Sequence, residues 1–222
     1  MMERIYRWFV KPHWGKLRID GRLIASLSLV VLAIIISLWK QNTSNFLRLG
    51  AMGFSFIGDS ILMNAWNIPK RLFKKGYFIV GGASFAIAQT IYAKSFWILV
   101  PEHSRDETFW VIYLAILVII TSVIIEMTLA TILKCKRMYS FSALFSIYFI
   151  FLIINGTCIL LAMVTRYVEI YEGILLALAI ISFILSDTII KFEKTASLDS
   201  DRWKFIKWAT YIAAQVGFIC VI

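Results

Sequence analysis

The chain has 222 residues, of which 60% are hydrophobic and only 16% are charged, and its mean hydropathy is +0.81. A soluble domain usually carries about a quarter charged residues, so this composition argues against a soluble enzyme or binding domain. The formal net charge is +10. Because the basic residues lie between apolar blocks, membrane topology explains this charge better than nucleic-acid binding does.

The N-terminal segment 1–22 is basic and has Ile5, Trp8 and Phe9 among its charged residues. Two roles are open for it. It is suited to lie on the anionic inner leaflet as an amphipathic interfacial helix, and it is equally suited to act as a charged leader that only sets orientation.

Seven apolar blocks follow, each near the roughly 20 residues that a helix needs to cross a hydrocarbon core about 30 Å thick. The blocks are 23–39, 46–66, 77–100, 109–133, 141–164, 168–190 and 205–222. The sequence therefore predicts an all-α fold, a polytopic transmembrane helical bundle with seven spans over residues 23–222.

The basic residues between the blocks support this count. The N-terminal segment and the connections after the second, fourth and sixth blocks are rich in Lys and Arg. The alternate connections have few, and the first of them has Lys40 and Arg48. Since Lys and Arg are enriched in cytoplasmic loops, seven spans predict a cytoplasmic N-terminus and a C-terminus outside.

Two pairs of blocks resemble each other. The sequence GDSIL around Asp59 matches SDTII around Asp187, and FAIAQ ending at Gln89 matches YIAAQ ending at Gln215. An even number of crossings separates the two copies, so they point the same way across the membrane. We predict a parallel internal repeat of a two-helix hairpin, formed by the second and third blocks and by the sixth and seventh.

Three acidic residues, Asp59, Glu126 and Asp187, lie inside apolar blocks. A charged side chain within the bilayer is costly, so such residues usually face the bundle interior and mark a functional site. We expect all three in the cytoplasmic half, Asp59 about two turns and Asp187 about one turn from the helix end. Structural roles stay open, because Asp187 can pair with Lys191 and Glu126 can bond to a hydroxyl group.

Uncharged polar residues accompany these acids. Each of the two glutamines has an aromatic residue at i−4 and another at i+3, which places the three side chains on one helix face. The flanking residues are Phe85 and Tyr92 for Gln89, and Tyr211 and Phe218 for Gln215. These amides, and Asn155, are suited to orient a water molecule or a lipid oxygen, or else to pack helices together.

The stretches GFSFIGDSILM from Gly53, GGASFAIAQTIY from Gly81, FILSD from Phe183 and YIAAQ from Tyr211 resemble the YhhN-like lysoplasmalogenases. The resemblance implies a multispanning membrane hydrolase that cleaves the vinyl ether of lysoplasmalogens, giving a fatty aldehyde and glycerophospho-ethanolamine or -choline. It matches the two aspartates to the family's intramembrane acids, and the two glutamines to positions where relatives have His or Gln. Relatives commonly have eight spans, and segment 1–22 stands here in place of the first.

Vinyl ether hydrolysis needs an acid that protonates the β-carbon and a carboxylate that stabilises the oxocarbenium ion and activates water. Two aspartates with different proton affinities supply both, so the predicted catalytic residues are Asp59 and Asp187, with their roles left open. The predicted substrate-binding residues are Gln89, Tyr92, Glu126, Asn155, Tyr211 and Gln215. Lys70, Arg71, Lys74 and Lys75 are candidates to hold the head-group phosphate, or only set topology. No metal, other cofactor or nucleic-acid partner is expected; the partners are the lysophospholipid substrate and membrane lipids.

Two other classes remain open. Parallel repeats with intramembrane carboxylates also occur in small transporters and channels. Against a carrier, the three prolines (Pro12, Pro69 and Pro101) lie outside the predicted spans or at their ends. A seven-helix receptor or scaffold would instead tolerate replacement of the acids.

Overall fold

The computed structural model describes residues 21–63, 76–102, 108–132, 143–165, 169–195 and 201–221. Within these ranges the chain forms seven α-helices and no strand, which confirms the all-α prediction. The helices are α2 (Gly21–Lys40), α3 (Thr43–Leu62), α4 (Gly76–Trp97), α6 (Thr108–Ile132), α7 (Ala143–Val164), α8 (Ile170–Thr195) and α9 (Asp201–Cys220). The N-terminal segment up to residue 20 and the basic cluster at 70–75 lie outside the described residues.

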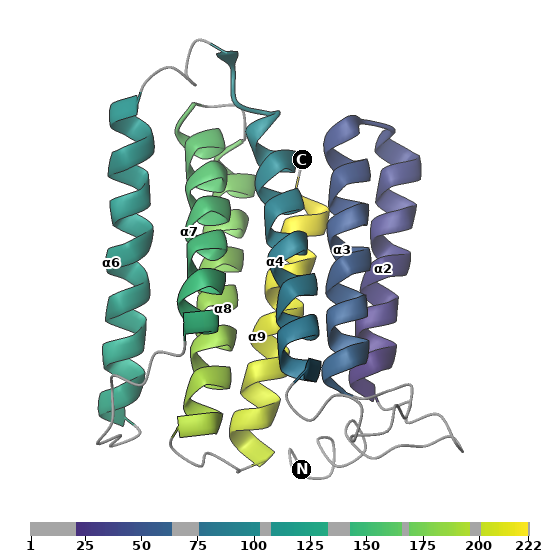
Figure 1. Ribbon diagram of the computed structural model, residues 1–222. Coiled ribbons are helices and arrows are strands. Elements are labelled where there is room, and N and C mark those ends of the chain that lie inside the picture. The colour runs from purple at the N-terminus through teal and green to yellow at the C-terminus, as the bar shows by residue number, and fades with distance from the viewer. Residues whose placement is uncertain are drawn as a thin grey trace.

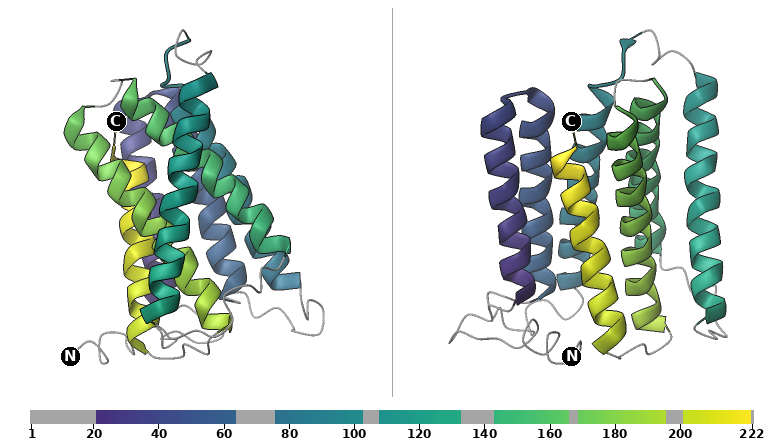
Figure 2. Two further views of the ribbon diagram at one scale, coloured as in Figure 1. Left: turned by 90° about the vertical axis from the view of Figure 1, so that its left-hand side faces the viewer. Right: turned by 180° about the vertical axis from the view of Figure 1, so that it is seen from behind.

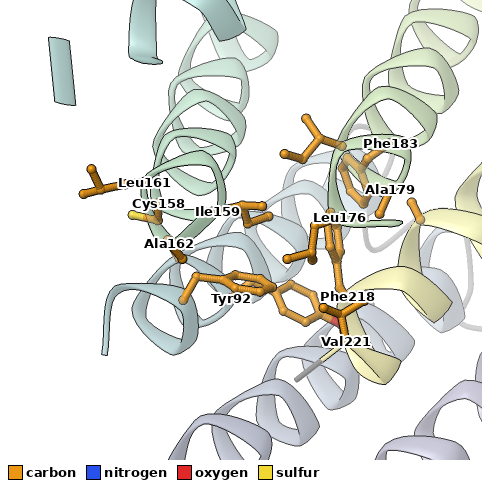
Figure 3. Packing of buried hydrophobic residues seen from close by; sticks show 14 of the residues in the cluster. Tyr92, Cys158, Ile159, Leu161, Ala162, Leu176, Ala179, Phe183, Phe218 and Val221 are labelled. Atoms are coloured by element: carbon orange, nitrogen blue, oxygen red, sulfur yellow. The ribbon is translucent and has the colours of Figure 1, made fainter. Parts of the chain in front are cut away.

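Successive helices run in opposite directions along one bundle, so α2 begins and α9 ends at opposite ends (Figure 1). The helices form two layers. One contains α3, α4, α7 and α6, and the other contains α2, α9 and α8 (Figure 2). The largest buried cluster lies between α4, α7, α8 and α9 (Figure 3).

The turn between α2 and α3 shows how local chemistry reverses the chain. Gln41 has a positive φ of 46°, a left-handed conformation common just after a helix end. Asn42 then caps the N-terminus of α3, and its side-chain oxygen accepts a hydrogen bond of 2.8 Å from the backbone N–H of Asn45. Because of this cap, α3 begins at Thr43 and not at Phe46 as the hydropathy pattern predicted.

Two other helix ends also differ from the sequence prediction. α3 ends at Leu62, so Asp59 lies in its last turn. α8 continues to Thr195, so Asp187 lies about two turns before the helix end. The predicted depths of the two aspartates are therefore wrong and are reversed. Hydropathy marks where a helix is apolar, whereas hydrogen bonds decide where it stops.

Glycines allow close approach within the two helix pairs that make up the predicted repeat. A Cβ atom on Gly58 of α3 would lie 2.8 Å from the Phe85 ring of α4. A Cβ atom on Gly217 of α9 would lie 2.6 Å from the Cβ of Ala179 of α8. The same two Cβ atoms would lie 3.2 Å from the Gly81 carbonyl oxygen and 3.5 Å from the Leu175 carbonyl oxygen. Each glycine therefore also lets the backbone of the partner helix come close, as small residues permit in membrane bundles. The duplication itself stays a prediction.

The outside of the bundle is more apolar than parts of its inside. On α2 most of the exposed side chains are large and aliphatic, whereas four of the five buried residues are small, including Ser26 and Ser37. This arrangement is the reverse of that in a soluble protein. Two of the described helical stretches, Gly21–Lys40 and Tyr171–Ile190, are long and apolar enough to cross a membrane. The seven-span topology and the side of each terminus stay predictions.

Candidate active site

Asp59 is the centre of the candidate site. Its side chain, on α3, is only 5% exposed. The Ser26 hydroxyl of α2 donates a hydrogen bond of 2.6 Å to Oδ2 of Asp59, and the Tyr211 hydroxyl of α9 donates one of 2.9 Å to the same oxygen. Three helices thus meet at one carboxylate oxygen, which is well placed to act as a proton acceptor.

Aromatic rings hold the Tyr211 phenol in place. The Tyr211 ring lies edge-on to Phe85, with centroids 6.3 Å apart, and edge-on to Trp208 at 5.3 Å. The ring of Phe183 on α8 is also 6.3 Å from it. Offset and edge-on ring pairs are favourable contacts, so they fix the direction in which the Tyr211 hydroxyl points.

Asp187, the second predicted catalytic acid, lies on α8. It lies four residues after Phe183, and residues four apart share one face of a helix. Since Phe183 contacts Tyr211, Asp187 lies on the face of α8 that packs against α9. Asp187 is partly exposed, whereas Asp59 is buried, so the two acids occupy different surroundings.

Four of the predicted substrate-binding residues form two bonded pairs. The Asn155 amide nitrogen donates to Oε1 of Gln89 at 2.5 Å, and the Tyr92 hydroxyl donates to Oε1 of Gln215 at 2.8 Å. All four side chains are buried. Nε2 of Gln89, Nε2 of Gln215 and Oδ1 of Asn155 have no hydrogen-bond partner among the described residues, so this polar layer keeps unused bonding capacity.

The polar layer lies next to the Asp59 site. Gln89 follows Phe85 and Gln215 follows Tyr211 by four residues, which is about one helical turn. Phe85 contacts Tyr211, and Tyr92 contacts Phe218 at 5.3 Å (Figure 3). The faces of α4 and α9 that hold the aromatic residues and the glutamines therefore pack against each other. Each of these ring contacts joins two positions that match in the predicted repeat.

Comparison with models of protein families gave a match to the YhhN family over residues 22–221. The chain belongs to the YhhN family. The match covers both aspartates, both glutamines and every partner of Asp59 named above, so the whole candidate site lies within the YhhN region. Comparisons with curated proteins and with solved structures gave no match.

Glu126 of this YhhN protein lies on α6, and its side chain is outside the part that the structure describes. α6 packs against α7 and α8 at one flank of the bundle (Figure 1). The partners of Asp59 come instead from α2 and α9. The described residues contain no group of three His, Cys, Asp or Glu side chains that could hold a metal ion.

Sequence reasoning missed two residues of the YhhN protein. Ser26 carries no charge or motif, and only the small and hydroxyl residues spaced along one face of α2 hinted that this face is buried. Arg48 was counted as a charge of a connection. The structure places it within α3, only 1% exposed, where Nη1 donates to the carbonyl oxygen of Val221.

Proposed function

We propose that this YhhN protein is a multi-pass membrane hydrolase that cleaves the vinyl ether of lysoplasmalogens, giving a fatty aldehyde and glycerophospho-ethanolamine or -choline. The observation that carries the proposal is the buried Asp59 carboxylate, which accepts two hydroxyl bonds at one oxygen. It lies inside a bundle with an aliphatic exterior. Membership of the YhhN family supports hydrolase chemistry.

The surroundings of Asp59 and Asp187 suggest which of them is the base and which is the proton donor. Oδ2 of Asp59 accepts both hydroxyl protons, so this oxygen is placed as an acceptor. Asp59 is then the base and the negative charge that faces the developing cation. Asp187 is the proton donor. A lone pair of electrons on the ether oxygen drives the transfer of the proton from Asp187 to the β-carbon of the vinyl ether.

The reaction balances with one water molecule. Asp187 gives its proton to the β-carbon, and the adjacent carbon becomes an oxocarbenium ion. Water attacks that carbon and loses a proton to Asp59. The hemiacetal then breaks its bond to glycerol: Asp59 gives its proton to the departing glycerol oxygen, and the hemiacetal hydroxyl group gives its proton to Asp187. This step releases aldehyde and alcohol and restores both aspartates. Tyr211 stays bonded to Asp59 and keeps the carboxylate oriented throughout.

Arg22 supports a direction for the bound lipid. It precedes Ser26 by four residues on α2, about one helical turn, and its guanidinium lies 5.8 Å above the Trp208 ring. Trp208 contacts Tyr211, which bonds to Asp59. In a lysolipid only the glycerol unit separates the ether from the phosphate. With the ether at Asp59, the phosphate would face Arg22, at the end of the bundle assigned to the cytoplasm.

The test is aldehyde release by purified protein from a lysoplasmalogen, with the matching saturated-ether and ester lysolipids as controls. We expect aldehyde only from the vinyl ether. In D2O the aldehyde should carry one deuterium on the carbon next to the carbonyl group, because the acid protonates carbon. Label uptake into proteoliposomes without aldehyde release would indicate a carrier instead.

Asp59→Asn and Asp187→Asn should each abolish turnover while leaving a folded protein, because asparagine keeps the side-chain shape. Glu102→Gln, which changes an exposed acid at the other end of the bundle, is the matched control and should keep full activity. Near-wild-type aldehyde release from either aspartate variant would refute the acid–base assignment.

A further inference from the structure

Arg48 forms a second polar cluster, at the end of the bundle opposite Asp59. It lies in the second turn of α3, with a side chain that is 1% exposed. Its Nη1 donates to Oδ1 of Asn45 at 3.3 Å and to the carbonyl oxygen of Val221. Its guanidinium lies 4.6 Å above the ring of Phe96. Among the described residues, the groups in contact with this positive charge are therefore neutral.

The unused atoms of this cluster are all donors. Nε and Nη2 of Arg48 and Nδ2 of Asn45 are buried and have no hydrogen-bond partner among the described residues. They lie together, because Asn45 and Arg48 are bonded to each other. A buried donor without an acceptor, and a buried charge without a counter-charge, are both costly. Several neighbouring N–H donors can be satisfied together by one ligand group that carries several acceptor oxygens.

The part of the chain that the structure describes meets this need only in part. The Phe96 ring attracts the guanidinium through its quadrupole and the Val221 carbonyl through its dipole, but neither group carries a negative charge. Glu172, in the first turn of α8, attracts the guanidinium across space. The free edge of a guanidinium matches the paired oxygens of a carboxylate or a phosphate. Exposed Lys40 and Lys94 at the same end of the bundle would draw anions toward it.

We propose that Arg48 and Asn45 form a binding site for a phosphate or carboxylate group, separate from the Asp59 site. Residues 48 and 59 are eleven positions apart on one helix, or about 16 Å along its axis. A lysolipid with its ether at Asp59 and its head group toward Arg22 points away from Arg48. The anion at Arg48 therefore belongs to a second molecule, either a lipid of the opposite leaflet or a free ion.

The experiment measures thermal unfolding of the full chain in a maltoside detergent, which contains no phosphate. Inorganic phosphate, acetate and phosphatidylglycerol are added separately, with chloride at equal ionic strength as the control. We expect a rise in Tm of roughly 5–10 °C at about a hundredfold excess over Kd. A response to phosphate or acetate identifies a free anion as sufficient, and a response to the lipid alone identifies a head group.

Asn45→Asp is the decisive variant, since it places a carboxylate directly against the guanidinium. We expect a Tm above that of the wild type in anion-free buffer and no further rise with any probe. Arg202→Gln, which removes an exposed charge at the opposite end of the bundle, should keep the response. Asp59→Asn should keep it too, which separates this site from the proposed hydrolysis. Absence of any rise in the wild type, or an equal rise in Asn45→Asp, would overturn the proposal.

Discussion

Replacing Tyr211 by phenylalanine, or Ser26 by alanine, removes a single hydroxyl group that donates to Oδ2 of Asp59. The bonds are 2.9 Å and 2.6 Å long and reach the same oxygen from different helices. If Asp59 is the base and faces the developing cation, each bond holds its carboxylate in position. Loss of a bond should therefore lower kcat/KM for aldehyde release.

The size of the loss follows from the strength of such bonds. A hydrogen bond to a charged group contributes about 1.5–3 kcal/mol, and about 1.36 kcal/mol corresponds to a tenfold change in rate. Each variant should therefore lower kcat/KM by roughly 10- to 150-fold. The shorter Ser26 bond should give the larger loss. Because both donors share one oxygen, the double variant should deviate from the sum of the two effects.

The assay is kcat/KM for aldehyde release by the purified variants. Ser37→Ala is the matched control, because Ser37 is a buried serine on the same helix that bonds to the backbone oxygen of Asn45 and not to a carboxylate. It should keep the wild-type kcat/KM. Ser26→Thr keeps the hydroxyl group and should restore kcat/KM toward the wild-type value. Wild-type kcat/KM in both Tyr211→Phe and Ser26→Ala would refute the role of these bonds.

Three further predictions concern packing and topology. Gly217→Ala should lower Tm, because its Cβ would meet that of a neighbouring alanine, whereas Gly53→Ala, which meets no atom within 4 Å, should leave Tm unchanged. Asn155→Leu should destabilise the protein by about 1–3 kcal/mol in denaturant unfolding, and adding Gln89→Leu should recover much of the loss, since neither amide of this bonded pair is then left without the other. An impermeant maleimide should label exposed Cys220 from outside intact cells when the other two cysteines are serine; labelling only after lysis would contradict the predicted C-terminal side.

The helices could be predicted from the sequence because each one coincides with a long run of apolar residues. Their ends could not, since a cap such as Asn42 is polar and lies outside the apolar run. The same limit affected Arg48. Charge counting assigns a residue to a connection or a span by position along the chain, whereas the burial of Arg48 depends on Phe96 and Val221, far away in sequence.

Part of the site could also be read from the sequence. The spacing around Gln89 and Gln215 predicted a shared face for each helix, and the rings at i−4 and i+3 are in contact between α4 and α9. Ser26 could not be found in this way. A lone serine in an apolar helix usually bonds to its own backbone, and only the fold shows that it meets Asp59, which lies 33 positions away.

The predicted repeat explains why two similar aspartates need not share one role. Tyr211 in one hairpin matches Phe85 in the other, and only Tyr211 has a hydroxyl group to donate to Asp59. At the other aromatic position Tyr92 has the hydroxyl group and matches Phe218, so the second cross-hairpin bond goes to Gln215. Each hairpin therefore supplies one phenol, at opposite positions. An acid and a base on a duplicated scaffold require unequal surroundings, and these exchanges between tyrosine and phenylalanine make the surroundings of the two aspartates unequal.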